Sequence, residues 1–191
     1  SWLPERIKRI VPLVGTTGLR FTEAVTLTDD HVDLDAGVLL IPRDLAKGRR
    51  VKPIALARCE VQLLREQMLV RPTGTRLVFP TAKGGVYSKS GFRSVWLPAL
   101  LAAGLAHVDE NGATVADFRF HWLRHTAISL MARAGMKPEL IAERVGHKDG
   151  GALIYRRYRH LFPSEIRAAV GLLDELLAPA AGGQGMVSAD A

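Results

Sequence analysis

The segment "HWLRHT" (residues 121–126) gathers His121, Arg124 and His125 within about two helical turns. On a helix, positions i, i+3 and i+4 share a face, so the three polar side chains can point the same way. Two histidines four residues apart also have the spacing of a metal-binding pair. Arg124 argues against a metal, because a permanent cation between two ligands repels a second cation and no nearby carboxylate offsets it. The segment is therefore better suited to an anion.

Three further segments could present polar groups to the same anion. In "TGLRFTEA", Arg20 follows a glycine turn at a helix start, although it could also be a surface arginine paired with Glu23. In "AKGRR", Lys47 lies at a hairpin tip, where a lysine is usually only solvated. In "GHKDGG", His147 follows a glycine at a helix end, where it could simply complement the helix dipole. The alternative for His121 is a partly buried histidine held by backbone groups.

The order of these segments, followed by a tyrosine before "HLFP", resembles the tyrosine recombinase (phage integrase) family. The resemblance covers about residues 5–177, and its most specific parts are the H-x-L-R-H-T block and the G-H pair with a tyrosine soon after it. It implies a site-specific DNA recombinase or integrase that cleaves and rejoins strands through a covalent 3′-phosphotyrosyl intermediate. It implies neither a cofactor nor a metal, and the sequence contains no P-loop, acidic metal cluster or glycine-rich dinucleotide loop.

The resemblance implies a catalytic role for each matching cation. Arg20 and Arg124 would clamp the scissile phosphate, and Lys47 would protonate the leaving 5′-oxygen. Arginine suits the clamp because it stays charged and donates bidentate hydrogen bonds to the charge that develops in the transition state. Losing such a donor commonly costs about 3–4 kcal/mol. The hairpin ends in "KPIAL" where members often have V-P-L, which leaves Arg43 as a distant alternative to Lys47.

The remaining polar residues of these segments also receive roles from the resemblance. His121 and His147 would hydrogen-bond the phosphate oxygens, and His121 could help to remove the proton of the tyrosine. Glu23 would brace the arginine three residues before it. His125 is expected to pack in its helix and orient its neighbours rather than touch the substrate.

The nucleophile is expected to be one of three tyrosines. Tyr87 lies far upstream in a predicted loop, whereas Tyr155 and Tyr158 follow His147 by eight and eleven residues. Many family members place the nucleophile nine or ten residues later, so the spacing does not decide between them. The run "YRHLF" after Tyr158 resembles the family's Y-x-H-L-F, and we therefore predict Tyr158 as the nucleophile. Tyr155 would then be an aromatic packed on the same helix.

Composition favours a polyanionic partner. The 191 residues include 26 Lys and Arg against 19 Asp and Glu, and the formal net charge is +7. Double-stranded DNA is the expected partner, ahead of an anionic membrane surface. A single cysteine excludes an intrachain disulfide, and no apolar run reaches the roughly 20 residues of a membrane span. We expect a cytoplasmic, nucleoid-associated protein of prokaryotic or phage origin.

Ten basic residues, Lys47 among them, are expected to line a DNA groove and to set salt dependence rather than sequence choice. They are Lys47, Arg49, Arg50, Lys52, Lys83, Lys89, Arg93, Arg156, Arg157 and Arg159.

Patterning predicts an α+β domain that is mainly α-helical with a small antiparallel sheet, which is also the fold of the tyrosine recombinase catalytic domain. The domain is expected to span residues 1–177, with a disordered tail over 178–191. Helices are predicted over residues 4–14, 19–27, 57–70, 89–105, from about 118, over 137–147 and over 164–177. The sheet is predicted within residues 31–56, and a short strand within 71–85.

Two features bear on assembly. Members usually carry a further N-terminal helical domain that closes a clamp around DNA, so the chain is either an excised catalytic domain or a minimal member with weaker DNA binding. Four protomers usually act together, and helix 164–177 could dock on a neighbouring protomer or on its own core.

Two alternative functions remain open at this point. Residues 129–147 resemble a helix-turn-helix with Gly135 at the turn and Ile141 facing inward, as in a non-catalytic DNA-binding module. A type IB topoisomerase would share the same active-site chemistry, but the chain is short for that family.

Overall fold

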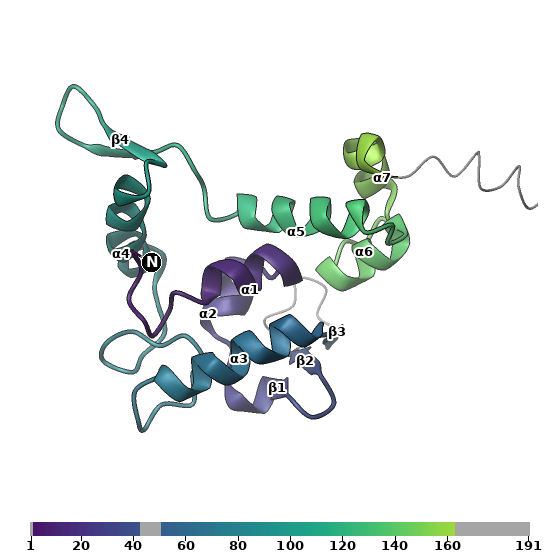
Figure 1. The fold of residues 1–191 in the computed structure, drawn as a ribbon, viewed down its shortest axis with the longest axis horizontal. Helices are drawn as coiled ribbons and strands as arrows, with labels where there is room; N and C mark the ends of the chain where they lie inside the picture. The colour runs from purple at the N-terminus through teal and green to yellow at the C-terminus, as the bar shows by residue number, and fades with distance from the viewer. Residues whose placement is uncertain (1, 43–50, 163–191) are drawn as a thin grey trace, which may run out of the picture.

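The computed structural model describes residues 2–42 and 51–162 of the chain (Figure 1). In chain order the elements are α1 (Ile10–Thr17), α2 (Phe21–Val25), η1 (Asp29–His31), β1 (Val32–Asp33), β2 (Val38–Ile41), β3 (Lys52–Ala55), α3 (Arg58–Val70), α4 (Lys89–Ala102), β4 (Ala106–Val108), β5 (Thr114–Ala116), α5 (Trp122–Arg133), α6 (Pro138–Val145), α7 (Ala152–Tyr158) and η2 (Arg159–Leu161). The predicted class, mainly helical with a small antiparallel sheet, is confirmed. The predicted helix 164–177 and the boundary at residue 177 lie outside the described residues.

The three-stranded sheet is antiparallel in the order β1-β2-β3. Its strands alternate as expected for a sheet with one covered face, because Leu39 and Ile41 are buried while Leu40 is exposed. On β3, Ile54 is buried, and Lys52 lies two residues before it, opposite Ile41 in the register. Side chains two residues apart on a strand share a face, so the sheet directs Lys52 to the covered side.

The structure differs from the predicted elements at the first helix, at the helix expected from about Phe118 and at the strand expected within residues 71–85. The first helix begins at Ile10 and continues to Thr17, where it ends because Gly18 adopts the left-handed conformation (φ 71°). The helix expected from about Phe118 begins at Trp122, since residues 118–120 pack their aromatic rings against α4 instead. The strand expected within residues 71–85 is a single bridge between Thr28 and Leu77.

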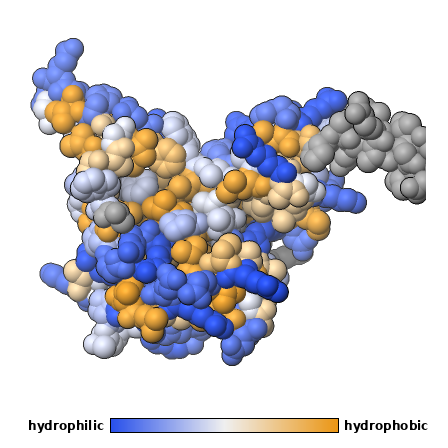
Figure 2. All heavy atoms as spheres, viewed as in Figure 1, coloured by the Kyte–Doolittle hydropathy of each residue, from blue (hydrophilic) through white to orange (hydrophobic). Residues whose placement is uncertain are grey.

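Buried side chains form two hydrophobic clusters that meet along α5. The first lies among α1, α2, α3, α4 and the sheet, and it includes Leu123 from the start of α5. The second lies among α5, α6 and α7, and it includes Ala127 from the next turn of the same helix. Figure 1 shows α5 running between the side that carries α4 and β4 and the side that carries α6 and α7. The space-filling view is hollowed between these two sides (Figure 2).

Close packing joins the clusters at the end of α1. A Cβ built on Gly18 would lie 2.8 Å from Val145 Cγ1 and 3.5 Å from the Cβ of Ala127, so α1 approaches α5 and α6 more closely than a side chain would allow. An ion pair fixes the other side of α6, where Arg144 Nη2 lies 2.8 Å from the buried carboxylate of Glu60 on α3. The ends of α1 and α6 are thereby held side by side.

Aromatic contacts set α2 against the start of α5. The rings of Phe21 and Phe120 meet edge to face with centroids 5.6 Å apart, and both contact Phe92 on α4 at 5.1 Å. Phe21 directly follows Arg20, and Phe120 directly precedes His121. This cluster therefore brings together two residues that are about a hundred positions apart in the sequence.

Among residues 2–42 and 51–162, no helix combines the length and apolar character that crossing a bilayer requires.

Candidate active site

A pocket of about 530 Å³ lies where α2, α5 and the connection between α6 and α7 meet. The structure places Arg20, His121, Arg124 and His147 around this one pocket, although they come from separate parts of the chain. His125 also lines it. The other lining residues are Ile128, Gly146, Lys148, Asp149 and Leu153.

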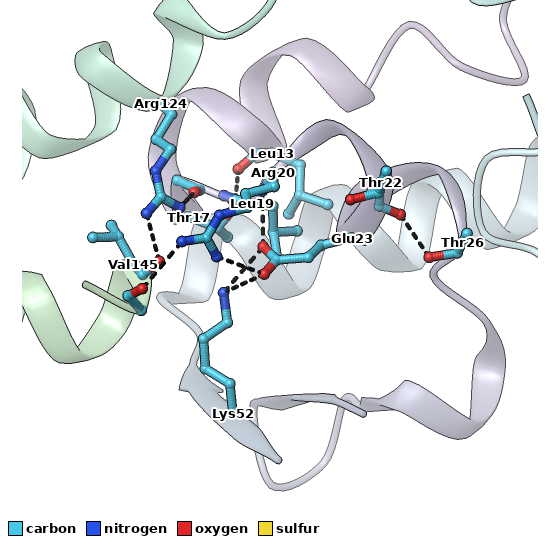
Figure 3. A network of polar contacts seen from close by, with 12 residues as sticks. Leu13, Thr17, Leu19, Arg20, Thr22, Glu23, Thr26, Lys52, Arg124 and Val145 are labelled. Carbon is cyan, nitrogen blue, oxygen red and sulfur yellow. Dashed lines mark hydrogen bonds and ion pairs between the residues drawn. The ribbon is translucent and has the colours of Figure 1, made fainter. Parts of the chain in front are cut away.

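Arg124 is held by the backbone at the ends of two helices. Its side chain is almost fully buried, with the residue 3% exposed, and its Nη1 and Nη2 donate to the carbonyls of Gly18 (2.5 Å) and Val145 (2.6 Å). Carbonyls at helix C-termini lack intrahelical partners and carry partial negative charge, so they suit a guanidinium. A guanidinium has five N–H donors, and these two bonds leave others for a ligand. The contacts are visible in Figure 3.

Arg20 is held by a buried carboxylate. Glu23, fully buried on α2, accepts from the backbone N–H of Arg20 at 2.8 Å and from its Nη1 at 2.9 Å. The backbone contact is the one that an N3 glutamate makes at a helix start. Arg20 Nη2 also donates to the carbonyl of Gly146 at 3.1 Å. The bracing role expected for Glu23 is thus present in the geometry, and Figure 3 shows the guanidinium held beside Arg124.

Lys52, one of the basic residues predicted to line a DNA groove, is the third cation of this network. Its Nζ lies 3.0 and 3.1 Å from the two carboxylate oxygens of Glu23, and its side chain is 11% exposed. The physical reason is the alternation on β3, which turns Lys52 to the same side as Ile54. That signal was available, because a buried Ile54 implies an inward side chain two residues before it. Lys47, together with Arg43, Arg49 and Arg50, lies outside the described residues.

The pocket carries excess positive charge, which perturbs its own groups. Burial lowers the pKa of Arg124 to about 10. The positive charge of Arg20 also lowers this pKa, whereas the negative charge of Glu23 raises it. Burial, followed by the charges of Arg124 and Arg20, also lowers the pKa of His121. Asp149 lines the pocket, but its carboxylate accepts from the backbone N–H of Leu153 at the start of α7. The site is therefore electrostatically suited to an anion.

His147 reaches the pocket because α6 ends at Gly146. Pro138 begins the helix and Gly146 closes it in the left-handed conformation (φ 72°), as expected from the sequence. The backbone N–H of His147 then donates to Ala142 O at 2.8 Å, the second bond of a Schellman cap. This turn places the histidine at the pocket and the Gly146 carbonyl on Arg20.

Tyr158 lies beside the pocket and is hydrogen-bonded to one of its walls. The residue is 8% exposed at the end of α7, and its hydroxyl lies 2.5 Å from Nδ1 of His125. The rings of His125 and His121 meet edge to face with centroids 5.3 Å apart. The contact of His125 with a tyrosine hydroxyl was not anticipated from the sequence, where no spacing rule joins positions 125 and 158.

The other two tyrosines are placed differently. Tyr155 is 47% exposed, and its ring lies under the guanidinium of Arg159 (5.7 Å) and near Phe162, away from the residues that line the pocket. Tyr87 lies in a loop, as expected, but is 5% exposed because its ring packs edge to face on Phe92. Within the described ranges, no three His, Cys, Asp or Glu side chains are grouped as ligands for a metal ion.

Comparison with known proteins identifies the family. The model of the phage integrase family matches residues 2–165. The chain belongs to the phage integrase family. Among curated relatives, the integrase of Salmonella phage P22 is 25% identical to this chain over 185 residues. The match covers 90% of this chain and 43% of that integrase. The tyrosine recombinase XerD of Mycobacterium tuberculosis is 28% identical to this chain over 149 residues. The match covers 74% of this chain and 44% of XerD. The chain thus spans less than half the length of these relatives.

Solved structures show the same fold. The Tn1549 transposon integrase, in complex with circular intermediate DNA, matches with a TM-score of 0.66 at 19% identity over 88% of this chain and 60% of that one. The catalytic domain of bacteriophage HP1 integrase matches with a TM-score of 0.58 at 20% identity. The match covers 94% of this chain and 93% of that domain. The predicted catalytic-domain fold is therefore confirmed.

The two alternative functions are not favoured by these findings. The helix-turn-helix pattern exists as α5, a turn with Gly135 at φ 79° and α6, and Ile141 is buried as predicted. However, Arg124 on α5 and Gly146 at the end of α6 belong to the pocket. The relatives are integrases and recombinases.

Proposed function

We propose that this chain carries the catalytic centre of a site-specific DNA recombinase, which cleaves and rejoins strands through a 3′-phosphotyrosyl intermediate. One observation carries the proposal: two anchored arginines and two histidines surround a single cationic pocket with a buried tyrosine hydroxyl at its edge. Membership of the phage integrase family supports it.

Arg20 and Arg124 are proposed to bind the scissile phosphate. Both guanidiniums are fixed by carbonyls or by Glu23, so they need little reorganisation when charge develops on the phosphate oxygens. His121 and His147 are proposed to donate hydrogen bonds to the same oxygens. The mutual repulsion of Arg20 and Arg124 is relieved when an anion enters the pocket.

Tyr158 is proposed to be the nucleophile. Its oxygen would attack the phosphorus, and the bond from phosphorus to the 5′-oxygen would break. The leaving alkoxide needs a proton, because its conjugate acid is an ordinary alcohol. Lys47, which lies outside the described residues, is proposed to supply it. The resulting phosphotyrosyl ester stores the bond energy until a 5′-hydroxyl of another strand reverses the step.

Double-stranded DNA is the proposed partner. Six of the basic residues predicted to line a DNA groove are described and exposed: Lys83, Lys89, Arg93, Arg156, Arg157 and Arg159. Each phosphate contact among them would release counterions and steepen the dependence of affinity on salt. Assembly of four protomers on two duplexes, a cytoplasmic, nucleoid-associated location and a domain end at residue 177 also remain proposals.

A suicide-substrate experiment tests the reaction. The chain is incubated with a pool of nicked duplexes of randomised sequence, in which cleavage releases a short fragment and traps the covalent adduct. We expect an adduct that survives denaturant. After nuclease digestion, peptide mapping is expected to find the remaining nucleotide only on the peptide that contains Tyr158. Sequencing of the trapped DNA then yields a target sequence for later assays. Absence of any tyrosine-linked DNA would refute the proposal.

Paired tyrosine variants assign the nucleophile. Tyr158→Phe is expected to abolish the adduct, whereas Tyr155→Phe, which alters an exposed ring on the same helix, is expected to retain it. The reverse result would transfer the nucleophile to Tyr155.

A further inference from the structure

We propose that His125 is the general base that accepts the proton of Tyr158 during strand cleavage and returns it during strand joining. The inference rests on the proposed function and adds a catalytic residue to it. It gives a new role to the second histidine of "HWLRHT", for which the sequence predicts only the orientation of its neighbours.

The geometry supports a direct proton transfer. Nδ1 of His125 lies 2.5 Å from the Tyr158 hydroxyl, within the reach that a general base requires. The two residues come from different helices, α5 and α7, and both helices are fixed by the second hydrophobic cluster, in which Tyr158 itself is buried. The pair is therefore preassembled before any DNA is bound.

The position of His125 connects the hydroxyl to the pocket. His125 lines the pocket with Arg20, His121 and Arg124, and its Nδ1 holds the Tyr158 hydroxyl beside the pocket. The hydrogen bond of the Tyr158 hydroxyl goes to His125, while His121 meets the ring of His125 edge to face. His121 thereby remains available for the phosphate, and the two histidines divide the roles.

The protonation states required for this role follow from the surroundings. Burial lowers the pKa of His125, and His121 and Arg124 on its own helix and Arg157 on α7 lower it further. A neutral imidazole can accept a hydrogen bond at Nδ1 when its proton resides on Nε2. Burial raises the pKa of Tyr158 against the opposing effects of Arg157 and Arg124, so the phenol keeps its proton and needs a base.

The hydroxyl proton of Tyr158 moves to Nδ1 of His125, and the phenolic oxygen forms a bond to phosphorus. The bond from phosphorus to the 5′-oxygen breaks, and its electron pair stays on that oxygen, which takes a proton from a general acid or from water. In the joining step the imidazolium of His125 returns its proton to the phenolic oxygen as the ester bond breaks.

Cleavage kinetics on the duplex selected by the wild-type chain test the proposal. His125→Ala is expected to slow formation of the covalent adduct about 10²–10⁴-fold, the usual contribution of a general base. His125→Asn keeps an amide oxygen near the position of Nδ1 but cannot hold the proton, so it is expected to remain slow. His107→Asn, on exposed β4, is the control and is expected to cleave at the wild-type rate.

Replacing Tyr158 by 3,5-difluorotyrosine distinguishes proton transfer from positioning. Because the fluorinated phenol ionises more readily, the deficit of His125→Ala is expected to shrink with this residue at position 158. A merely structural role predicts the same deficit with either phenol. A full wild-type rate for His125→Asn, or a rate within twofold of wild type for His125→Ala, would overturn the inference while leaving adduct formation intact. Failure of the wild-type chain to form any adduct would instead refute the proposed function.

The resting pair can be examined without DNA and without a variant that alters His125. In ¹⁵N spectra of the wild-type chain at neutral pH, His125 is expected as the tautomer with its proton on Nε2, and Tyr158→Phe is expected to shift the Nδ1 resonance. A proton on Nδ1 in the wild-type chain would overturn the assignment of His125 as the base.

Discussion

Replacing Glu23 by glutamine should destabilise the fold as well as loosen the arginine clamp. Glu23 is fully buried, and its carboxylate is shared between Arg20, whose side chain is 22% exposed, and Lys52, at 11%. Removing one partner of a buried ion pair typically costs about 3–5 kcal/mol, because it leaves uncompensated charge. Glutamine retains one carbonyl acceptor but no charge, so both cations would lose their counterion. We therefore expect Glu23→Gln to lower the free energy of unfolding by about 3 kcal/mol or more.

Urea denaturation at pH 7, followed by circular dichroism, measures this loss. Glu66→Gln serves as the control, since Glu66 also pairs with an arginine but is exposed, and it is expected to change stability little. Adding Lys52→Met to Glu23→Gln removes one orphaned charge and should recover part of the loss. A decrease below about 1 kcal/mol for Glu23→Gln would refute the reasoning, because it would mean that the carboxylate does not hold the two cations.

The pH dependence supplies a second check on Glu23. Burial raises the pKa of Glu23, but the charge of Lys52 and the hydrogen bonds from Arg20 and Lys52 lower it more in sum, so the net shift is downward. The stabilisation is therefore complete above the unfolded pKa of about 4.3 and is lost as pH falls through the lower folded pKa. The difference between wild type and Glu23→Gln should shrink over that acidic range. A difference that grew towards low pH would contradict the sign.

Three other substitutions give simple stability predictions by urea denaturation. Arg124→Lys should cost about 1–3 kcal/mol, because an ammonium cannot satisfy both helix-end carbonyls; a neutral result would mean that they find other partners. Gly151→Ala should lower the free energy of unfolding more than Gly112→Ala. Both glycines have positive φ, but only at Gly151 would the new Cβ lie 2.7 Å from backbone atoms. Equal losses of stability would exclude the clash. Ile141→Ala should cost about 2–5 kcal/mol from the second cluster, whereas its exposed neighbour Leu140→Ala should cost less than about 0.5 kcal/mol, and a reversed order would contradict the burial.

Local chemistry made much of the fold predictable. Helix α6 follows directly from a proline at its start and a glycine at its end, and the alternating strands β2 and β3 follow from their apolar residues. The late start of α5 was not predictable from the sequence, because Phe118 and Phe120 directly precede the helix but contact α4 and α2 instead of continuing it. Tertiary packing overrides local preference there.

The site was predictable where a motif fixes the residue and unpredictable where only folding creates the contact. Arg20, His121, Arg124 and His147 were all selected from sequence patterns, and the structure brings them to one pocket. The pairing of Lys52 with Glu23 depends on the side of β3 that faces α2. That contact requires a register that no short motif encodes, although strand alternation hinted at it.

Because Arg124 is anchored to the ends of α1 and α6, the affinity of the pocket for an anion is coupled to the stability of the contact between these two helix ends. A guanidinium that bridges two helix termini can orient a bound anion only while those termini remain together. By linkage, an anion that occupies the pocket must raise the free energy needed to pull the two halves apart. A substitution remote from the pocket that weakens the contact between these two helix ends would therefore lower the affinity for the anion without contacting it.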